Sequence, residues 1–284
     1  MNSPGPLISL VINYFNPRAL TRLEAIAIMC LESIHGGTRN RFEVILSDGS
    51  GVESIRVKDA CERLGLTYLL CPVPKNFEAI YNQGLALARG QYCAMLEYDV
   101  FPVNNWDVRI LGEMQRTGAN IALPYLSSCD NHSQQTGFVV RHYTFEPSGM
   151  SHNFVVMDRQ ALSVLYPLDE QFNATCNDND MYMRARSAGL RIIVCDAGGM
   201  VHYRGASEAY APWTFSEDHE KFKAKYPQLN YWDRYGLYDF FTPTFCRSRL
   251  YRCMARIVAA IPHRRVSTYL LNHLTRIEPI MHRI

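Results

Sequence analysis

Several signatures of common protein classes are missing from this 284-residue sequence. Its nine cysteines form no Cys-x-x-Cys pair or other zinc-type spacing, and those inside apolar runs behave as small hydrophobic groups. No Gly-x-Gly-x-x-Gly follows the first strand-like run and no Gly-x-x-x-x-Gly-Lys-Ser/Thr occurs, which disfavours dinucleotide dehydrogenases and P-loop nucleotidases. If the chain binds a nucleotide, a metal ion must therefore neutralise the phosphates.

Long apolar runs are missing too. No window approaches about 18 uninterrupted apolar residues, so we expect no transmembrane helix. The first residues, Met-Asn-Ser-Pro-Gly-Pro, have neither the basic nor the apolar region of a signal peptide. We therefore expect a reducing, cytoplasmic environment. The sequence has no internal repeat, and its 48% hydrophobic and 20% charged residues are ordinary for a folded globular chain.

Charge is almost balanced overall but unevenly distributed. From Cys246 to Ile284 the chain carries eight Arg and one acid, a net charge of +7. Residues 1–245 carry 21 Lys and Arg against 26 Asp and Glu, a net charge of −5. An acidic body with a basic tail suggests that the tail meets an anionic partner.

Apolar runs of strand length alternate with helical patterns along the chain. Residues 7–14 form a continuous apolar run, as expected of a parallel strand buried on both faces. A helix is expected to begin at Asn16-Pro17, because Pro suits the first helical turn. This alternation predicts an α/β fold with a parallel, doubly wound sheet. The other expected strands are 42–46, 66–70, 90–97, 121–123, 154–157 and 190–195, and the other expected helices are 53–64, 76–89, 106–117, 178–188 and 214–226.

Polar residues stand at the ends of the first strands. Glu97 and Asp99 follow an apolar run and, two positions apart, can face one ligand together. Their oxygens suit a hard divalent cation that carries phosphates, although two acids can also merely solvate a loop. Asn13–Asn16 and Asp48–Ser50 end the two earlier strands. Ligands of open α/β sheets bind beyond the carboxyl ends of the strands, so the three groups are expected to converge.

The order of these motifs resembles that of GT-A fold glycosyltransferases. The sequence is most similar to the inverting glycosyltransferase family 2, with some similarity to β-1,4-galactosyltransferases. The resemblance implies a GT-A (Rossmann-like) α/β fold over roughly residues 6–205, with a mostly parallel sheet flanked by helices. The motifs that carry it are Leu7–Asn16, Phe42–Ser50, Asn82–Gly90, Glu97–Asp99, Asn177–Asp180 and Val201-His202.

The resemblance implies a nucleotide site at the ends of the first two strands. Asp48 matches the second Asp of the family's Asp-Asp-Gly-Ser and would accept a hydrogen bond from N3–H of a uracil-like base. Ser47 stands where the first Asp is expected. Alternatively, Asp48 only caps the turn that follows. Further nucleotide contacts are implied at Asn13, Phe15, and Lys75 or Asn76.

A metal site is implied where the family has Asp-x-Asp. Asp99 would be a direct ligand of Mn²⁺ or Mg²⁺, and Glu97 would hold the ribose or a metal-bound water. His202 matches a late His that completes the metal site in many of these enzymes, although a single His is often structural. Mixed carboxylate and imidazole ligands suit Mn²⁺ better than Mg²⁺.

The catalytic base is implied in the segment 177–180, which resembles the family's Glu-Asp-x-Asp element. Asn177 replaces the Glu. An inverting transfer needs one carboxylate to deprotonate the acceptor hydroxyl, and we assign this role to Asp178, with Asp180 in support. Alternatively, either acid only caps the helix. The loops 124–150 and 205–215, with Tyr143, Tyr210 and Trp213, would shape the sugar and acceptor pockets.

The tail alternates Arg with apolar residues in a helical pattern that Pro262 interrupts. Such a basic amphipathic pattern is typical of a membrane-surface element, which would place a lipid-linked acceptor within reach at the inner face of the membrane. The alternative is a helical pair that packs on the domain or across a dimer. Nucleic acid is a less favoured partner, because no recognition motif accompanies the charge.

The sequence therefore predicts a glycosyltransferase that uses a nucleotide-sugar, with UDP-sugars favoured, and a saccharide or lipid-linked acceptor. We expect a GT-A domain at 1–213, with a nucleotide-sugar half to about 100 and an acceptor half after it, and a helical extension at 214–284. One rival is a catalytically silent GT-A domain that acts as a membrane-associated scaffold. Another is a sugar-nucleotidyltransferase, but its Gly-rich loop is missing after the first strand.

Overall fold

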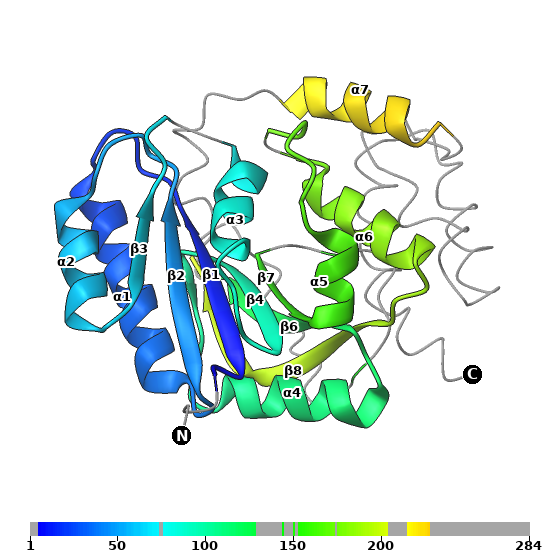
Figure 1. Cartoon of the computed structure of the whole chain (residues 1–284), viewed down its shortest axis with the longest axis horizontal. Helices are drawn as coiled ribbons and strands as arrows, with labels where there is room; N and C mark the ends of the chain where they lie inside the picture. Colours follow the sequence, from blue (N-terminus) through cyan, green and yellow to red (C-terminus); the bar gives the residue numbers. More distant parts are fainter. Residues whose placement is uncertain are drawn as a thin grey trace.

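The computed structural model describes residues 5–73, 76–128, 144, 150, 153–173, 175–203 and 215–227. Within these ranges, eight strands form one sheet in the order β3-β2-β1-β4-β7-β6-β8-β5 (Figure 1). The strands are β1 (Ile8–Tyr14), β2 (Phe42–Asp48), β3 (Thr67–Leu70), β4 (Tyr92–Glu97), β5 (Val100–Phe101), β6 (Ile121–Ser128), β7 (Phe154–Asp158) and β8 (Ile192–His202). The helices are α1 (Thr21–Gly37), α2 (Ile55–Arg63), α3 (Phe77–Leu85), α4 (Trp106–Thr117), α5 (Arg159–Leu165), α6 (Asn177–Ser187) and α7 (Phe215–Lys225).

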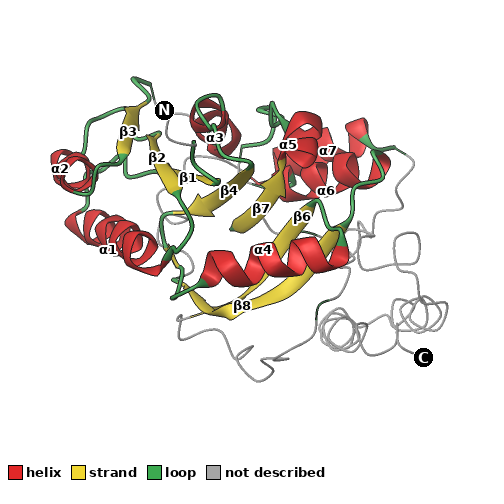
Figure 2. Cartoon of the chain, turned by 60° about the horizontal axis from the view of Figure 1, so that its bottom comes forward, coloured by secondary structure: helices red, strands yellow, loops and turns green. Residues whose placement is uncertain are grey.

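Helices cover both faces of the sheet (Figure 2). Alternate residues of a strand point to opposite faces, and β1 uses both. Leu10 and Ile12 belong to one core with side chains of α1, α2 and α4, whereas Val11 belongs to a second core with α3, α5 and α6. This burial on both sides explains why β1 is apolar without interruption.

The predicted fold class is confirmed, because the sheet is mostly parallel and flanked by helices. Strand β1 pairs in parallel with β2 and β4, β2 with β3, and β6 with β8. Strand β7 runs antiparallel between β4 and β6, and β5 runs antiparallel to the end of β8. In the part of the chain that the structure describes, none of the helices combines the length and the hydropathy that a membrane span requires.

The expected start of the first helix at Asn16-Pro17 is wrong, since α1 begins at Thr21. The side chain of Asn16 closes a turn before the helix: its Oδ1 accepts from the Leu20 N–H at 2.9 Å, and its Nδ2 donates to the Leu20 carbonyl at 3.1 Å. Asn commonly stabilises such turns through its own side chain, and here that tendency outweighs the preference of Pro for a first helical turn.

Several other elements differ from the expected pattern. Strand β6 continues to Ser128 rather than ending at 123, so the expected loop 124–150 is wrong at its start, and the short strand β5 was not expected. Helix α3 ends at Leu85 rather than 89, and the short helix α5 was not expected. Strand β8 does not stop at 195 but continues through Gly198-Gly199 to His202, because its pairing with β6 resumes after an irregularity between Pro124 and Leu126. Glycine pairs usually indicate a loop, so sequence reasoning places the strand end too early.

Helix α1 fixes the segment that follows β4. The Cys30 thiol donates to the Val100 carbonyl at 3.1 Å, and the Ser33 hydroxyl donates to the Pro102 carbonyl. These contacts hold β5, and therefore the residue before it, Asp99, against a helix whose inner face is packed in the core.

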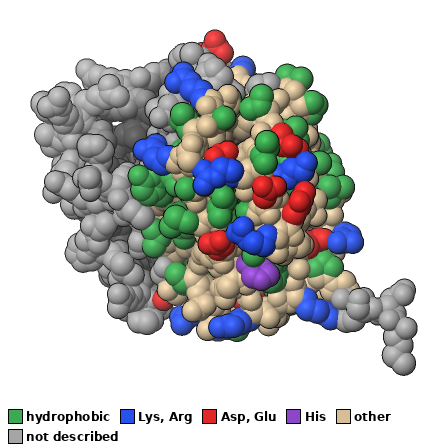
Figure 3. Space-filling view, turned by 90° about the vertical axis from the view of Figure 1, so that its left-hand side faces the viewer, with side chains coloured by type: hydrophobic (Ala, Val, Ile, Leu, Met, Phe, Trp, Pro, Cys, Tyr) green, Lys and Arg blue, Asp and Glu red, His purple; other side chains and the backbone are tan. Residues whose placement is uncertain are grey.

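The opposite edge of the sheet, around α1 and α2, carries charges of both signs. Figure 3 shows Lys, Arg, Asp and Glu side chains intermixed with apolar ones on this side of the molecule. Exposed ion pairs of this kind contribute about 0–1 kcal/mol each, so the two helices are held mainly by their buried faces. The pairs are Arg56–Glu24 at 3.3 Å, Lys58–Glu53 at 2.8 Å and Arg63–Glu32 at 3.2 Å.

Helix α7 is fastened to the loop that precedes α6 by the buried carboxylate of Asp218. This carboxylate accepts from the backbone N–H of Asn173, at 2.9 and 3.0 Å to its two oxygens, and from the Thr175 N–H at 3.0 Å. Lys221 lies 3.6 Å from the same carboxylate. A buried charge is tolerated when hydrogen bonds and an opposite charge satisfy it, as they do here.

The carboxyl end of α7 holds the first turn of α6. Lys225 Nζ lies 2.5 Å from carboxylate oxygens of both Asp169 and Asp180, and the Tyr226 hydroxyl donates to Asp180 at 2.6 Å. Phe222 packs on Phe172, with ring centroids 6.1 Å apart. The expected domain boundary at 213/214 stays a prediction, since residues 204–214 and 228–284 lie outside the described ranges.

Replacing Asp218 tests how much this attachment contributes to stability. Asp218→Asn removes one acceptor oxygen and turns an amide donor toward backbone N–H groups. We expect the free energy of unfolding to fall by on the order of 3 kcal/mol. Thermal and urea unfolding measure the loss, with Glu220→Gln, an exposed carboxylate on the same helix, as the control. A variant as stable as the wild type would show that α7 does not depend on Asp218.

Candidate functional site

Polar side chains from three neighbouring strands line up at the carboxyl end of the sheet. In the strand register, Asn13 of β1 lies between Ser47 of β2 and Glu97 of β4. Alternation along each strand puts the three on the same face as Val11 and Ile45, the face that α3 covers. The predicted convergence of the strand ends is therefore present for these side chains.

Within the part of the chain that the structure describes, the side chains of two members of this row have no hydrogen-bond partner. Asn13 is 2% exposed, and neither its amide nitrogen nor its amide oxygen makes a hydrogen bond. The Ser47 hydroxyl is buried and unpaired as well. Helix α3 lies directly above, because a Cβ at Gly84 would come within 2.7 Å of Ser47 Oγ. Buried polar groups without partners are rare, and they commonly mark a site that a ligand or water completes.

Asp48 lies on the opposite face of the sheet from this row. It pairs in register with Tyr14, whose side chain packs in the core under α1 and α2. One carboxylate oxygen accepts from the Ser50 N–H at 2.9 Å and the other from the Tyr68 hydroxyl at 2.5 Å. Burial raises the pKa of Asp48, while these two hydrogen bonds lower it. The hydrogen bond from the Ser50 N–H is the turn cap expected as the alternative role of Asp48. A hydrogen bond between Asp48 and a nucleotide base stays a prediction.

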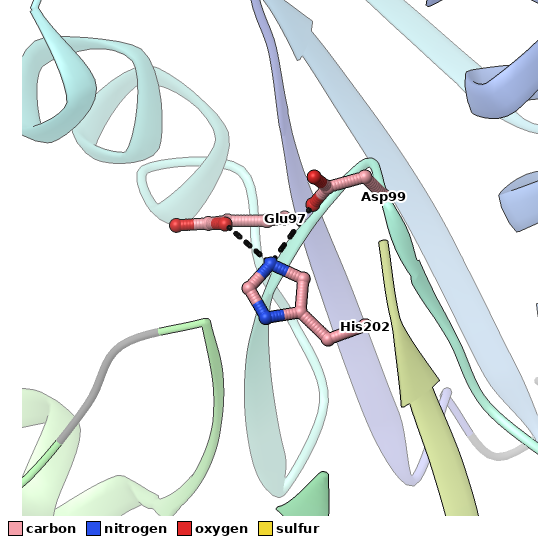
Figure 4. A group of neighbouring side chains, drawn as sticks. All are labelled: Glu97, Asp99 and His202. Carbon is pink, nitrogen blue, oxygen red and sulfur yellow. Dashed lines mark ion pairs between the residues drawn. The ribbon is translucent and has the colours of Figure 1, made fainter. Parts of the chain in front are cut away.

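Glu97, Asp99 and His202 form a compact group with metal-ligand chemistry (Figure 4). His202 Nε2 lies 3.5 Å from Glu97 Oε2 and 3.4 Å from Asp99 Oδ1. One ligand atom from each residue can be chosen so that all lie within 4.8 Å of one another. The pairing of β5 with β8 creates the group, since Val100 lies opposite His202 and the Tyr203 N–H donates to the Asp99 carbonyl at 2.8 Å.

The electrostatics of this group favour a cation. Burial lowers the pKa of His202, but Asp99 and Glu97 outweigh it and raise the pKa to about 9. Burial raises the pKa of Asp99 to about 6. A proton on His202 answers the two carboxylates when no other cation is bound; a divalent metal would take the place of that proton, because a ligating imidazole is neutral. Apart from its ion pair with His202, Asp99 Oδ1 has no hydrogen-bond partner among the described residues, and oxygen and imidazole donors are the ligand types of Mn²⁺, so these residues fit the predicted metal.

The two predicted catalytic acids have different surroundings. Asp178 stands half-buried at the start of α6, where its carboxylate accepts from the Asn179 N–H at 2.7 Å. A helix amino terminus favours the ionised carboxylate. Asp180 is buried; Tyr226 and Lys225 of the α7 region both contact its Oδ1, and Arg184 lies 3.7 Å from its Oδ2. The structure thus ties Asp180 to α7, while the role of Asp178 as base stays a prediction.

The other residues predicted to contact the nucleotide, Asn76 and Phe15, are held by contacts within the fold. Asn76 caps α3, since its Oδ1 accepts from the Ala79 N–H at 2.9 Å, and its Nδ2 donates to the Glu170 carbonyl at 2.6 Å. Phe15 is buried beyond the end of β1. Their contacts with a nucleotide stay predictions. Among the residues that the sequence analysis singled out, those outside the described ranges are Lys75, Tyr143, Tyr210, Trp213 and the tail 246–284.

Sequence reasoning missed two buried polar residues of α3, the helix that covers this face of the sheet. Glu78 and Tyr81 are buried and lie one turn apart on the same helix face. Burial raises the pKa of Tyr81, and the charges of Glu97, Glu78 and Asp99 add to the effect. The available signal was a Glu in the first turn of an expected helix, with an apolar residue on either side of it. Nothing in the sequence indicates what this Glu packs against.

Comparisons with known proteins agree with this architecture. Two crystal structures of S. aureus TarS share the fold. The first, of residues 1–349, has a TM-score of 0.58 at 13% identity, over 96% of this chain and 88% of the other. The second has a TM-score of 0.57 at 12% identity, over 96% of this chain and 53% of the other. No curated protein matches the sequence significantly. The family model described as "Glycosyl transferase family 2" matches residues 9–167, more than half of the chain. The chain therefore belongs to glycosyltransferase family 2.

Proposed function

We propose that this glycosyltransferase moves a sugar from a nucleotide-sugar, with UDP-sugars favoured, to a saccharide or lipid-linked acceptor by a metal-assisted, inverting displacement. One observation carries the proposal. The Glu97–Asp99–His202 group continues the row of Asn13 and Ser47, so cation ligands and unpaired hydrogen-bonding groups share one edge of the sheet. A nucleoside diphosphate with its cation has the chemistry to satisfy both.

The residues divide the reaction between donor and acceptor sides. A divalent metal held by Asp99 and His202, with Glu97 beside them, would supply positive charge that stabilises the leaving diphosphate. On the acceptor side, Asp178 takes the proton of the attacking hydroxyl. The hydroxyl oxygen forms a bond to the anomeric carbon of the donor sugar while the bond from that carbon to the diphosphate breaks. Lys225 and Tyr226 support this arrangement indirectly, because they fix Asp180 on the same helix turn as Asp178.

On the donor side, Asn13 and Ser47 offer the groups that a nucleotide would use. The amide of Asn13 can donate and accept, and the hydroxyl of Ser47 can do the same. Phe15, Asp48 and Asn76 remain part of the proposed nucleotide site. The basic segment 246–284 is proposed to meet an anionic membrane surface, which would bring a lipid-linked acceptor to the enzyme at the inner face of the membrane.

A metal requirement follows from this proposal. With a panel of UDP- and GDP-sugars, we expect Mn²⁺ to support transfer or slow hydrolysis and to raise the melting temperature, and chelation to abolish both effects. His202→Ala should lower the apparent Mn²⁺ affinity by at least about tenfold. His35→Ala, at an exposed histidine of α1, is the control. Wild-type protein that shows no metal-dependent nucleotide effect would favour the silent-domain alternative.

The assignment of the base predicts a separation of binding from chemistry. Asp178→Asn keeps the size of the side chain but removes the proton acceptor, so we expect transfer to fall by about 100-fold or more. Calorimetry should find UDP–Mn²⁺ binding within about twofold of the wild type, because Asp178 acts on the acceptor. Asp59→Asn, on the exposed side of α2, serves as the control. Loss of nucleotide binding together with transfer would show that Asp178 is not the base.

A further inference from the structure

The motif Asn82–Gly90 is one of those that carry the family resemblance, but the reaction as described gives its first residue no role. Asn82 lies in α3 and is 8% exposed. Its Oδ1 accepts from the Leu168 N–H at 2.8 Å, and its Nδ2 donates to the Leu168 carbonyl at 3.0 Å. The same Nδ2 donates to Glu170 Oε1 at 2.9 Å. Asn82 therefore ties α3 to the loop between α5 and α6.

The contact with Leu168 explains why an asparagine stands at position 82. Leu168 is 3% exposed and lies outside the helices and strands, so its buried backbone N–H and carbonyl need partners from another part of the chain. A side-chain amide offers both a donor and an acceptor, as a peptide group does, whereas an ionised carboxylate only accepts. Loss of the Asn82 amide would leave both backbone groups of Leu168 without these partners.

The same loop is bonded to α6 through Arg184. Its Nη1 donates to the carbonyl of Pro167, the residue before Leu168, at 3.1 Å. The same Nη1 lies 3.7 Å from Asp180 Oδ2. Asp180 belongs to the first turn of α6, two residues after Asp178. A continuous series of contacts therefore runs from α3, through the backbone of the loop, to the helix turn that carries the proposed base.

Helix α3 also covers the donor side of the site. Gly84 follows Asn82 by two residues, and a Cβ at Gly84 would come within 2.7 Å of Ser47 Oγ. One helix thus lies over the row of Ser47 and Asn13 and is bonded to the loop that leads to Asp178. A shift of a catalytic group by about 1 Å can cost about 100-fold in rate, so the position of this loop matters for the chemical step.

We propose that Asn82 is a positioning residue for Asp178, which it places by holding Leu168 and Glu170 against α3. The proposal rests on the proposed function, because it assumes that Asp178 accepts the proton. Asn82 acts through the loop and need not touch the donor or the acceptor. Its loss should therefore impair the chemical step more than the binding of the donor.

Asn82→Ala removes all three hydrogen bonds. We expect kcat to fall by at least about tenfold, while calorimetry finds UDP–Mn²⁺ affinity within about twofold of the wild type. Wild-type kcat in N82A, or loss of UDP–Mn²⁺ binding together with kcat, would overturn the proposal.

Asn120→Ala is the matched control. Asn120 Oδ1 accepts from the Arg191 N–H at 3.1 Å and its Nδ2 donates to Asp158 Oδ2 at 2.9 Å. These contacts resemble those of Asn82 but lie at the opposite end of the strands, directly before β6 and β8. N120A should lower the melting temperature without changing kcat. An equal loss of kcat in N82A and N120A would show a general effect of stability and would overturn the proposal.

A second set of variants tests the contact with Glu170, and serves where Asn82→Ala does not fold. Asn82→Asp keeps an acceptor for the Leu168 N–H but sets a carboxylate against that of Glu170, so kcat should fall as in N82A. Glu170→Gln alone keeps an acceptor oxygen, and we expect its kcat within about twofold of the wild type. The double variant N82D/E170Q returns a donor to the contact and should have a kcat at least about threefold above that of N82D. A double variant no more active than N82D would overturn the proposal.

Hydrogen exchange of backbone amides tests the hold on the loop without a transfer assay. In N82A we expect exchange over residues 168–173 and the first turn of α6 to be about fivefold faster or more, and in N120A to be unchanged there. Unchanged exchange in N82A would overturn the proposal. If the wild type transfers no sugar, the proposed function fails, and the exchange rates still decide whether Asn82 holds this part of the chain.

Discussion

The pairing of β5 with the end of β8 is the constraint on which the site depends. It places His202 opposite Val100, the residue that follows Asp99. Two antiparallel residue pairs thereby bring together side chains that are far apart in the sequence. Helix α1 holds β5 from the other side through Cys30. Without this pairing, Glu97 and Asp99 would be two acids at a strand end, without an imidazole to complete a cation site.

The parallel register of β1, β2 and β4 adds the second half of the arrangement. It lines up Ser47, Asn13 and Glu97 on the face that α3 covers, and leaves the first two buried without partners. The apolar cores on both faces of the sheet supply the stability that tolerates these unpaired groups. Beyond the sheet, α7 fixes the loop before α6, so the proposed acceptor side is positioned by contacts made late in the chain.

Much of this was predictable from local pattern. The apolar run of β1, the alternation of strands with helices and the Glu97-x-Asp99 spacing are properties of short segments, and they predicted the fold class and a pair of acids at a strand end. The family resemblance, rather than local spacing, singled out His202, which the structure places beside Glu97 and Asp99. Strand ends and helix starts were less predictable. The side chain of Asn16 formed a turn where Pro17 favoured a helix, and Gly198-Gly199 stayed inside a strand.

What could not be predicted depends on contacts between distant segments. The face on which Asp48 lies follows from the strand register, and its two partners come from the following loop and from β3. The attachment of Asp180 to Lys225 joins two different helices, so it leaves no local spacing signal.

The central claim is that the carboxyl end of the sheet binds a metal–diphosphate group. Crystals of the full chain grown with UDP and Mn²⁺ test it directly through the anomalous scattering of manganese. We expect a manganese peak among Asp99, His202 and Glu97, in contact with the diphosphate. Bound UDP with its manganese held elsewhere, or with no manganese at these residues, would contradict it.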